Sequence, residues 1–193
     1  DLSTYAALRM ARASTPAHII FVKKEHNELI NHLIAHECGH VLRIFGVPEE
    51  KRLIAKTNAR MKLNVLSGIE DEIQNLSAVL PFERLAQIIN LWYGGICRQV
   101  TNFPPDIRIE KWLYNDYPEL REYQLLSIRM QQQEALSGFS AEAQDISPPT
   151  FINLSNIMNY AFFRILGLHF GTNLVRPFTN MKYLEKGKKL ASL

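Results

Sequence analysis

Apolar residues recur at helical spacing along most of this chain. In the stretch 27–45 they stand at the three- and four-residue intervals that bury one face of a helix. Gly46 and Pro48 follow, where such a helix is expected to end. The same periodicity predicts further helices over 3–12, 48–62, 68–81, 82–93, 107–114, 118–136 and 150–169.

The stretch 17–23 (AHIIFVK) has a different pattern. Its Ile, Phe and Val residues favour a strand directly before the helix over 27–45. We expect breaks at 102–105 and at 137–149, where prolines, glycines and serines gather. The pattern predicts an α+β fold that is mostly α-helical, with a small β-sheet next to the 27–45 helix.

Length fits either one large domain or two small ones, and 193 residues can bury a core without disulfides. We expect residues 1–136 to form one domain. We expect residues 150–193 to add a C-terminal helical segment that packs on it, so that the whole chain is one compact domain.

The 27–45 helix carries the run His36-Glu37-Cys38-Gly39-His40, an H-E-x-x-H motif. Residues four apart lie on one face of a helix, so both imidazoles can bind one metal ion. Zinc suits imidazole nitrogen and an open coordination position. Glu37 lies about 100° around the helix, where its carboxylate can accept a proton from a water on the metal. The alternative is a pair of core histidines with Glu37 in an ion pair.

His32 stands one turn before His36 on the same face. About 12 Å of helix axis separates it from His40, so these two cannot share one ion with His36. We expect His32 to be a core residue or to support a ligand. Cys38 projects roughly opposite His36, at about 200°, and is expected to be a packed thiol.

A third ligand must come from elsewhere in the chain, commonly from a Glu. The 68–81 helix offers Glu70, Asp71 and Glu72 at its start, and Glu72 stands next to the apolar face. We predict Glu72 as the third zinc ligand, with Glu70 as second choice. The alternative is that all three form a solvated acidic first turn, where negative charge is favoured.

The run A-H-E-C-G-H, 35–40, resembles the A-H-E-L-G-H motif of ImmA/IrrE-type metallopeptidases, and 72–80 resembles their E-A-N-x-F-A-A-x-L helix. The resemblance covers roughly residues 15–82. If Pro81 is aligned with the proline of the Leu-Met-Pro run that usually follows this helix in the family, Glu70 takes the place of the Glu ligand instead of Glu72. The resemblance implies a zinc endopeptidase, with 1–136 as a metallopeptidase-like domain. The implied substrate is a helix-turn-helix repressor in a stress- or phage-response operon.

Two further features bear on this hypothesis. An edge strand at 19–22 would hold an extended peptide by main-chain hydrogen bonds, unless it is paired on both sides. Cys97 follows two glycines, which favours a flexible loop whose thiolate could occupy the open zinc position and inhibit the enzyme. The alternative is an ordinary buried cysteine.

Composition bears on where the protein acts and on whether it contacts membranes or nucleic acids. Two cysteines make no disulfide framework, and the chain has no apolar run long enough to span a bilayer, so we expect a cytoplasmic protein without membrane contact. A net charge of +3 does not by itself indicate nucleic-acid binding. The basic stretch 176–189 is a candidate contact for DNA or an acidic partner. The competing function is a zinc-stabilised sensor or binding module that does not cleave.

Overall fold

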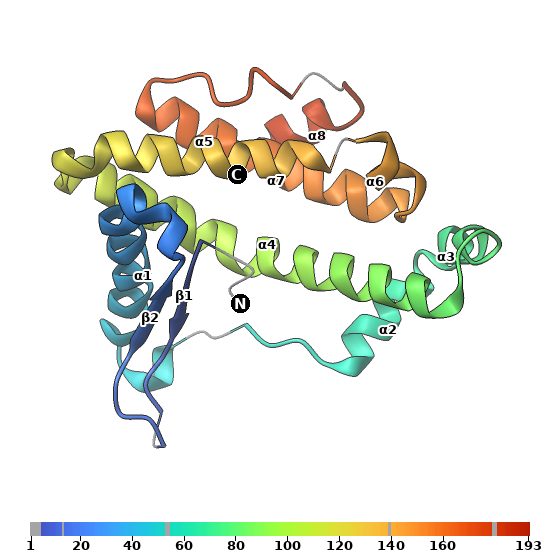
Figure 1. Cartoon of the computed structure of the whole chain (residues 1–193), viewed down its shortest axis with the longest axis horizontal. Helices are drawn as coiled ribbons and strands as arrows, with labels where there is room; N and C mark the ends of the chain where they lie inside the picture. Colours follow the sequence, from blue (N-terminus) through green and yellow to red (C-terminus); the bar gives the residue numbers. More distant parts are fainter. Residues whose placement is uncertain (1–4, 13, 53–54, 139, 179–180) are drawn as a thin grey trace. The chain divides into compact units, whose positions relative to one another are not determined.

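Helices make up most of the protein in a computed structural model, with one small two-stranded sheet (Figure 1). The structure describes residues 5–12, 14–52, 55–138, 140–178 and 181–193. The predicted mostly helical α+β fold is confirmed. None of the helices in this described part is long and apolar enough to cross a membrane.

The chain divides into two units, each assembled from two separate segments. Unit 1 comprises residues 1–54 and 105–130, and unit 2 comprises residues 55–104 and 131–193. The helices α4 (Phe82–Asp116) and α5 (Arg121–Ser137) therefore each contribute to both units. The expected division into 1–136 and 150–193 stays a prediction.

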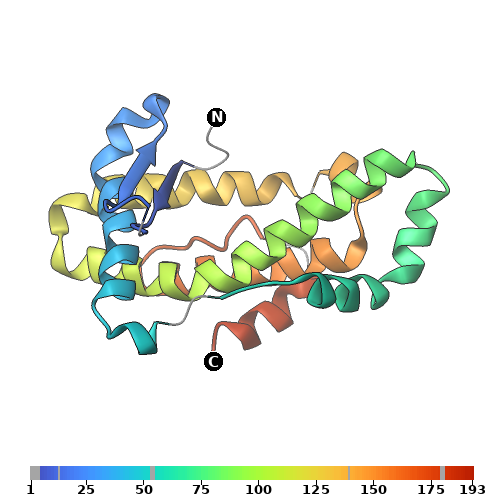
Figure 2. The ribbon, with the colours of Figure 1, turned by 90° about the horizontal axis from the view of Figure 1, so that it is seen from below.

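Unit 1 contains an antiparallel hairpin of β1 (Ala6–Arg9) and β2 (Ile19–Val22), in a register that pairs Ala6 with Val22. The hairpin lies beside α1 (Ile30–Phe45), as Figures 1 and 2 both show. The predicted strand and its place next to the motif helix are thus confirmed. The helix expected over 3–12 is wrong, because pairing with β2 outweighs the helical spacing of that short segment.

The helix α1 follows a 3-10 helix over Lys24–Leu29 and ends at Gly46, whose N–H donates to the Leu42 carbonyl. It crosses α4 closely at Gly39, where an added Cβ would lie 2.6 Å from Ile109 Cγ2. Apolar side chains from α1, α4 and α5 form the core of unit 1, namely Leu33, Ile109, Leu113 and Ile128.

Pro104 and Pro105 do not interrupt α4, so the break expected at 102–105 is wrong. The prolines lack N–H donors, yet packing holds the helix on either side of them. In unit 2 the Phe103 ring lies 4.5 Å from that of Phe162, and in unit 1 Ile109 is buried against Gly39. The boundary between the two units falls between these two prolines.

Unit 2 is built around α7 (Pro149–Phe170), which is buried along much of its length and packs against α8 (Met181–Leu190). Three shorter helices complete it: α2 (Ala59–Ser67), α3 (Glu70–Ser77) and α6 (Ala141–Asp145). The side chains of Leu76, Leu85 and Ile89 make a small apolar cluster between α3 and α4.

The helix expected to run from Pro48 to residue 62 is wrong. A short 3-10 helix covers Glu49–Lys51, and α2 begins only at Ala59. The Asn58 side chain accepts a hydrogen bond from the Met61 N–H and so caps α2 at that point. Leu53 and Ile54, within the expected helix, lie outside the described residues.

Candidate metal centre

Two helices of unit 1 bring five polar side chains into one ladder. The helix α1 presents His32, His36 and His40 at successive turns of one face. The facing part of α4 presents Asp106 and Glu110, also one turn apart. Imidazoles and carboxylates alternate along the ladder in the order His32, Glu110, His36, Asp106, His40.

The outer end of the ladder gathers three ligand atoms. His40 Nε2 lies 3.2 Å from His36 Nε2 and 3.1 Å from Asp106 Oδ1, and His36 Nε2 lies 3.7 Å from the same oxygen. This group has the composition and spacing to hold a metal ion. Asp106 Oδ1 is buried and makes no hydrogen bond of good geometry within the described part of the protein. A cation would supply the charge that this oxygen needs.

The inner end of the ladder fixes the orientation of His36. Its Nδ1 lies 2.7 Å from Glu110 Oε1, and Glu110 is only 1% exposed. An ionised carboxylate only accepts, so Nδ1 is the donor, and in the neutral ring Nε2 is left with its lone pair toward His40 and Asp106. Such a partner commonly sets the tautomer of a metal-binding histidine.

Two buried side chains hold Glu110 in turn. His32 Nε2 lies 3.1 Å from Glu110 Oε2, and the Gln124 amide donates to both the side chain and the main-chain carbonyl of Glu110. His32 is 1% exposed, which confirms the expectation that it is a core residue. Its ring also lies near that of His36, with centroids 6.3 Å apart, and it supports the outer group through Glu110.

The electrostatics of the ladder favour a cation between the carboxylates. Burial alone would lower the pKa of His36, but its contacts with Asp106 and Glu110 raise that pKa to about 10. Burial alone would raise the pKa of Glu110, because it disfavours the charged carboxylate. His32 and His36 nevertheless hold the pKa of Glu110 well below its usual range. The carboxylates that favour a proton on His36 also favour a metal ion beside it.

Glu37 is half-buried next to the outer group. Burial raises the pKa of its carboxyl, the charges of His36 and His40 lower it, and the charge of Asp106 adds to the rise. The net effect is a raised pKa of the Glu37 carboxyl, which suits a carboxylate that accepts and then returns a proton.

The sequence reasoning missed Asp106 and Glu110. Their four-residue spacing matches that of His36 and His40, and this was the available signal. Asp106 directly follows two prolines in a stretch for which a break was expected. A metal site also needs contributions from segments distant in sequence, and local periodicity does not pair such segments.

The predicted third ligand lies in unit 2. The Glu72 carboxylate accepts hydrogen bonds from the Thr150 N–H at 3.0 Å and from the Thr150 hydroxyl at 2.6 Å, and so caps the start of α7. Glu70 is exposed and lies beside Gln74. The assignment of either residue as a zinc ligand stays a prediction.

The structure also locates the two cysteines. Cys38 is exposed on α1, so the expected packed thiol is wrong. Ile34 and Leu42, one turn to either side of Cys38 on α1, are exposed as well. Cys97 is half-buried in unit 2, within α4 and beside Tyr93. The flexible loop expected there is wrong, because both preceding glycines are helical. The inhibitory role of Cys97 stays a prediction.

Comparison of the chain with models of protein families, with curated proteins and with solved structures finds no match in any of the three. The ladder is the feature of this chain that points to a function.

Proposed function

We propose that this protein is a zinc-dependent endopeptidase that cleaves a specific protein partner. The observation that carries the proposal is the outer group of the ladder, where His36, His40 and Asp106 gather their ligand atoms beside the half-buried Glu37. Two imidazole nitrogens and one carboxylate oxygen are a common protein ligand set for catalytic zinc.

His36 Nε2, His40 Nε2 and Asp106 Oδ1 would hold the ion. Bound zinc would supply Lewis acidity and make water a stronger acid and nucleophile near neutral pH. Glu37 accepts the proton of the attacking water and delivers it to the leaving amine of the peptide. Glu110 holds Nδ1 of His36, so that Nε2 would remain available to the ion, and His32 and Gln124 hold Glu110 in place.

The hairpin beside α1 offers a place for the substrate. Among the described residues, β2 pairs only with β1, so its other edge has no strand partner. A peptide in extended form would add to that edge through main-chain hydrogen bonds. This supports a peptide substrate rather than a small molecule at the metal.

The resemblance of residues 35–40 to ImmA/IrrE-type metallopeptidases suggests the kind of partner. We propose a helix-turn-helix repressor of a stress- or phage-response operon as substrate, and the cytoplasm as the place of action. The basic C-terminal stretch could add a contact to an acidic partner or to DNA, since Arg176, Lys186 and Lys189 are exposed.

The test combines metal analysis with a cleavage assay. Purified wild type should contain about one zinc per chain and cut a helix-turn-helix protein encoded by a neighbouring gene. The Glu37→Gln variant should retain the zinc and lose cleavage. The exposed Glu49→Gln variant serves as matched control and should behave as wild type.

Two outcomes would contradict the proposal. If Glu37→Gln still cleaves at the wild-type rate, Glu37 is not the base. If wild type binds zinc but cleaves none of the neighbouring repressors, the protein is better described as a zinc-stabilised sensor or binding module.

A further inference from the structure

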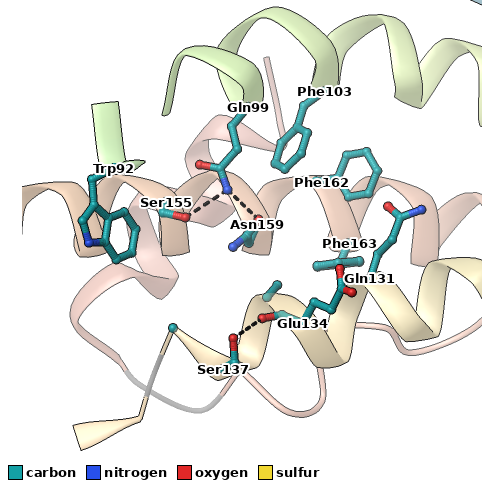
Figure 3. Close-up of a pocket in the computed structure, with 12 residues that line it drawn as sticks. Trp92, Gln99, Phe103, Gln131, Glu134, Ser137, Ser155, Asn159, Phe162 and Phe163 are labelled. Atoms are coloured by element: carbon teal, nitrogen blue, oxygen red, sulfur yellow. Dashed lines mark hydrogen bonds between the residues drawn. The ribbon is translucent and has the colours of Figure 1, made fainter. Parts of the chain in front are cut away.

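A cavity lies wholly within unit 2 (Figure 3). Residues of α4, α5 and α7 line it, and its volume is about 390 Å³. Small-molecule sites in proteins fall in the range of roughly 300–1,000 Å³ and are mostly apolar with a few placed polar groups.

The apolar part of the wall is aromatic. Trp92, Phe103 and Phe162 all face the cavity, and the rings of Phe103 and Phe162 lie 4.5 Å apart at an interplanar angle of 31°. These two rings pack on each other, so a planar ligand would stack on an aromatic side that is turned to the cavity, such as that of Trp92.

Three carboxamides stand among the polar side chains of the wall. The Gln99 Nε2 donates to Ser155 Oγ and to Asn159 Oδ1, each at 2.9 Å, as Figure 3 shows. These two hydrogen bonds fix the orientation of the side-chain amides of Gln99 and Asn159. They leave Gln99 Oε1 buried without a donor among the described residues. Asn159 is 6% exposed, and its Nδ2, turned away from Gln99 in Figure 3, has no acceptor in the described part of the chain.

The third carboxamide is that of Gln131. Gln131 stands beside Phe162 in Figure 3, and within the described ranges neither its oxygen nor its nitrogen forms a hydrogen bond. The wall therefore presents hydrogen-bond donors and acceptors of carboxamide side chains that have no partner among the described residues. No lysine or arginine stands among the lining residues, which include one carboxylate, Glu134.

We propose that this cavity binds the adenine ring of a nucleoside. A carboxamide matches adenine through two parallel hydrogen bonds, in which its oxygen accepts from N6 and its nitrogen donates to N7. Gln131 is free to make this pair, and Asn159 Nδ2 offers a further donor to a ring nitrogen. The aromatic side chains provide the stacking surface. The lack of a cationic lining residue favours the nucleoside over its phosphorylated forms.

The fluorescence of Trp92 provides the assay. Because the chain has two tryptophans, the Trp112→Phe variant of the full-length protein leaves Trp92 as the sole reporter. We expect saturable quenching with adenosine. Inosine carries a carbonyl in place of the N6 amine and should bind at least tenfold more weakly. Adenosine monophosphate should bind no more tightly than adenosine.

Gln131→Leu should weaken adenosine binding at least tenfold. Gln133→Leu makes the same change at an exposed position of the same helix and should leave binding unchanged. The inosine comparison uses the unaltered pocket, so it remains decisive if Gln131→Leu fails to fold. The proposal is overturned if adenosine does not saturate at millimolar concentration, if inosine binds equally well, if the monophosphate binds more tightly, or if a folded Gln131→Leu binds as before.

Discussion

Gly39 and Ile109 are in contact where α1 and α4 cross, and a Cβ on Gly39 would lie 2.6 Å from Ile109 Cγ2. This close approach places Asp106 and Glu110 within reach of the histidines on α1. The glycine inside the H-E-x-x-H motif therefore has a structural role: it sets the distance between the two helices that make the ladder.

Gly39→Ala should separate the helices. We expect it to lower the free energy of unfolding by about 1–3 kcal/mol, since Ile109 is β-branched and buried. It should also weaken zinc binding. Chemical denaturation and a competitive zinc chelator measure the two effects.

A matched control exists on α4. An added Cβ on Gly95 would meet nothing within 4 Å, so Gly95→Ala should stabilise the protein by about 0.5–1 kcal/mol through helix propensity. Equal behaviour of the two alanine variants would show that the crossing at Gly39 is not tightly packed.

Glu110→Gln should weaken zinc binding by about 10–100-fold, because the amide no longer holds the His36 tautomer as an ionised carboxylate does. Circular dichroism should show the variant folded, and cleavage should be restored in part by excess zinc. An exposed acid on the same helix, Asp116→Asn, is the control. Unchanged zinc affinity in Glu110→Gln would exclude an orienting role for this carboxylate.

The metal-free protein should be most stable in mildly acidic solution. The pKa of His36 rises from 6.5 to about 10 on folding, so its stabilisation is full below about 6.5 and is lost as pH rises through about 10. The pKa of Glu110 falls from 4.5, so its stabilisation is present above about 4.5 and is lost as pH decreases further.

Urea denaturation of chelator-treated protein across this pH range measures the effect. His36→Gln should remove the alkaline loss of stability and keep part of the acidic one, because His32 still holds the pKa of Glu110 down. If His36→Gln and wild type lose stability alike above neutral pH, the alkaline transition belongs to another group.

The sequence was sufficient for features that depend on local spacing. The repeat of apolar residues around His36 predicted α1, and the residues 19–22 predicted a strand beside it. The helix carrying Glu72 was also predicted, and its apolar face is buried through Ile69 and Leu76. The apolar repeat is only partly buried: Leu33 and Leu76 are buried, whereas Leu42 and Phe45 of α1 are exposed and the strand at 19–22 is half-buried.

Features that depend on distant segments could not be predicted in this way. Residues 6–9 form a strand only because β2 pairs with them, and α4 passes through Pro104 and Pro105 because both of its halves are packed. Asp106 directly follows these prolines, so it reaches the candidate site only because α4 continues through them. The hydrogen bonds of Glu72 to Thr150 likewise join residues far apart in sequence.

The central claim is that Asp106 completes a metal site with His36 and His40. Zinc affinity of Asp106→Asn and Glu72→Gln, measured by competition with a chelator at constant pH, tests it most directly. We expect Asp106→Asn to lose more affinity than the roughly 10–100-fold that an outer hydrogen-bond partner contributes, and Glu72→Gln to bind as wild type does while α7 loses a cap. Wild-type affinity in Asp106→Asn, with loss of zinc in Glu72→Gln, would contradict the account.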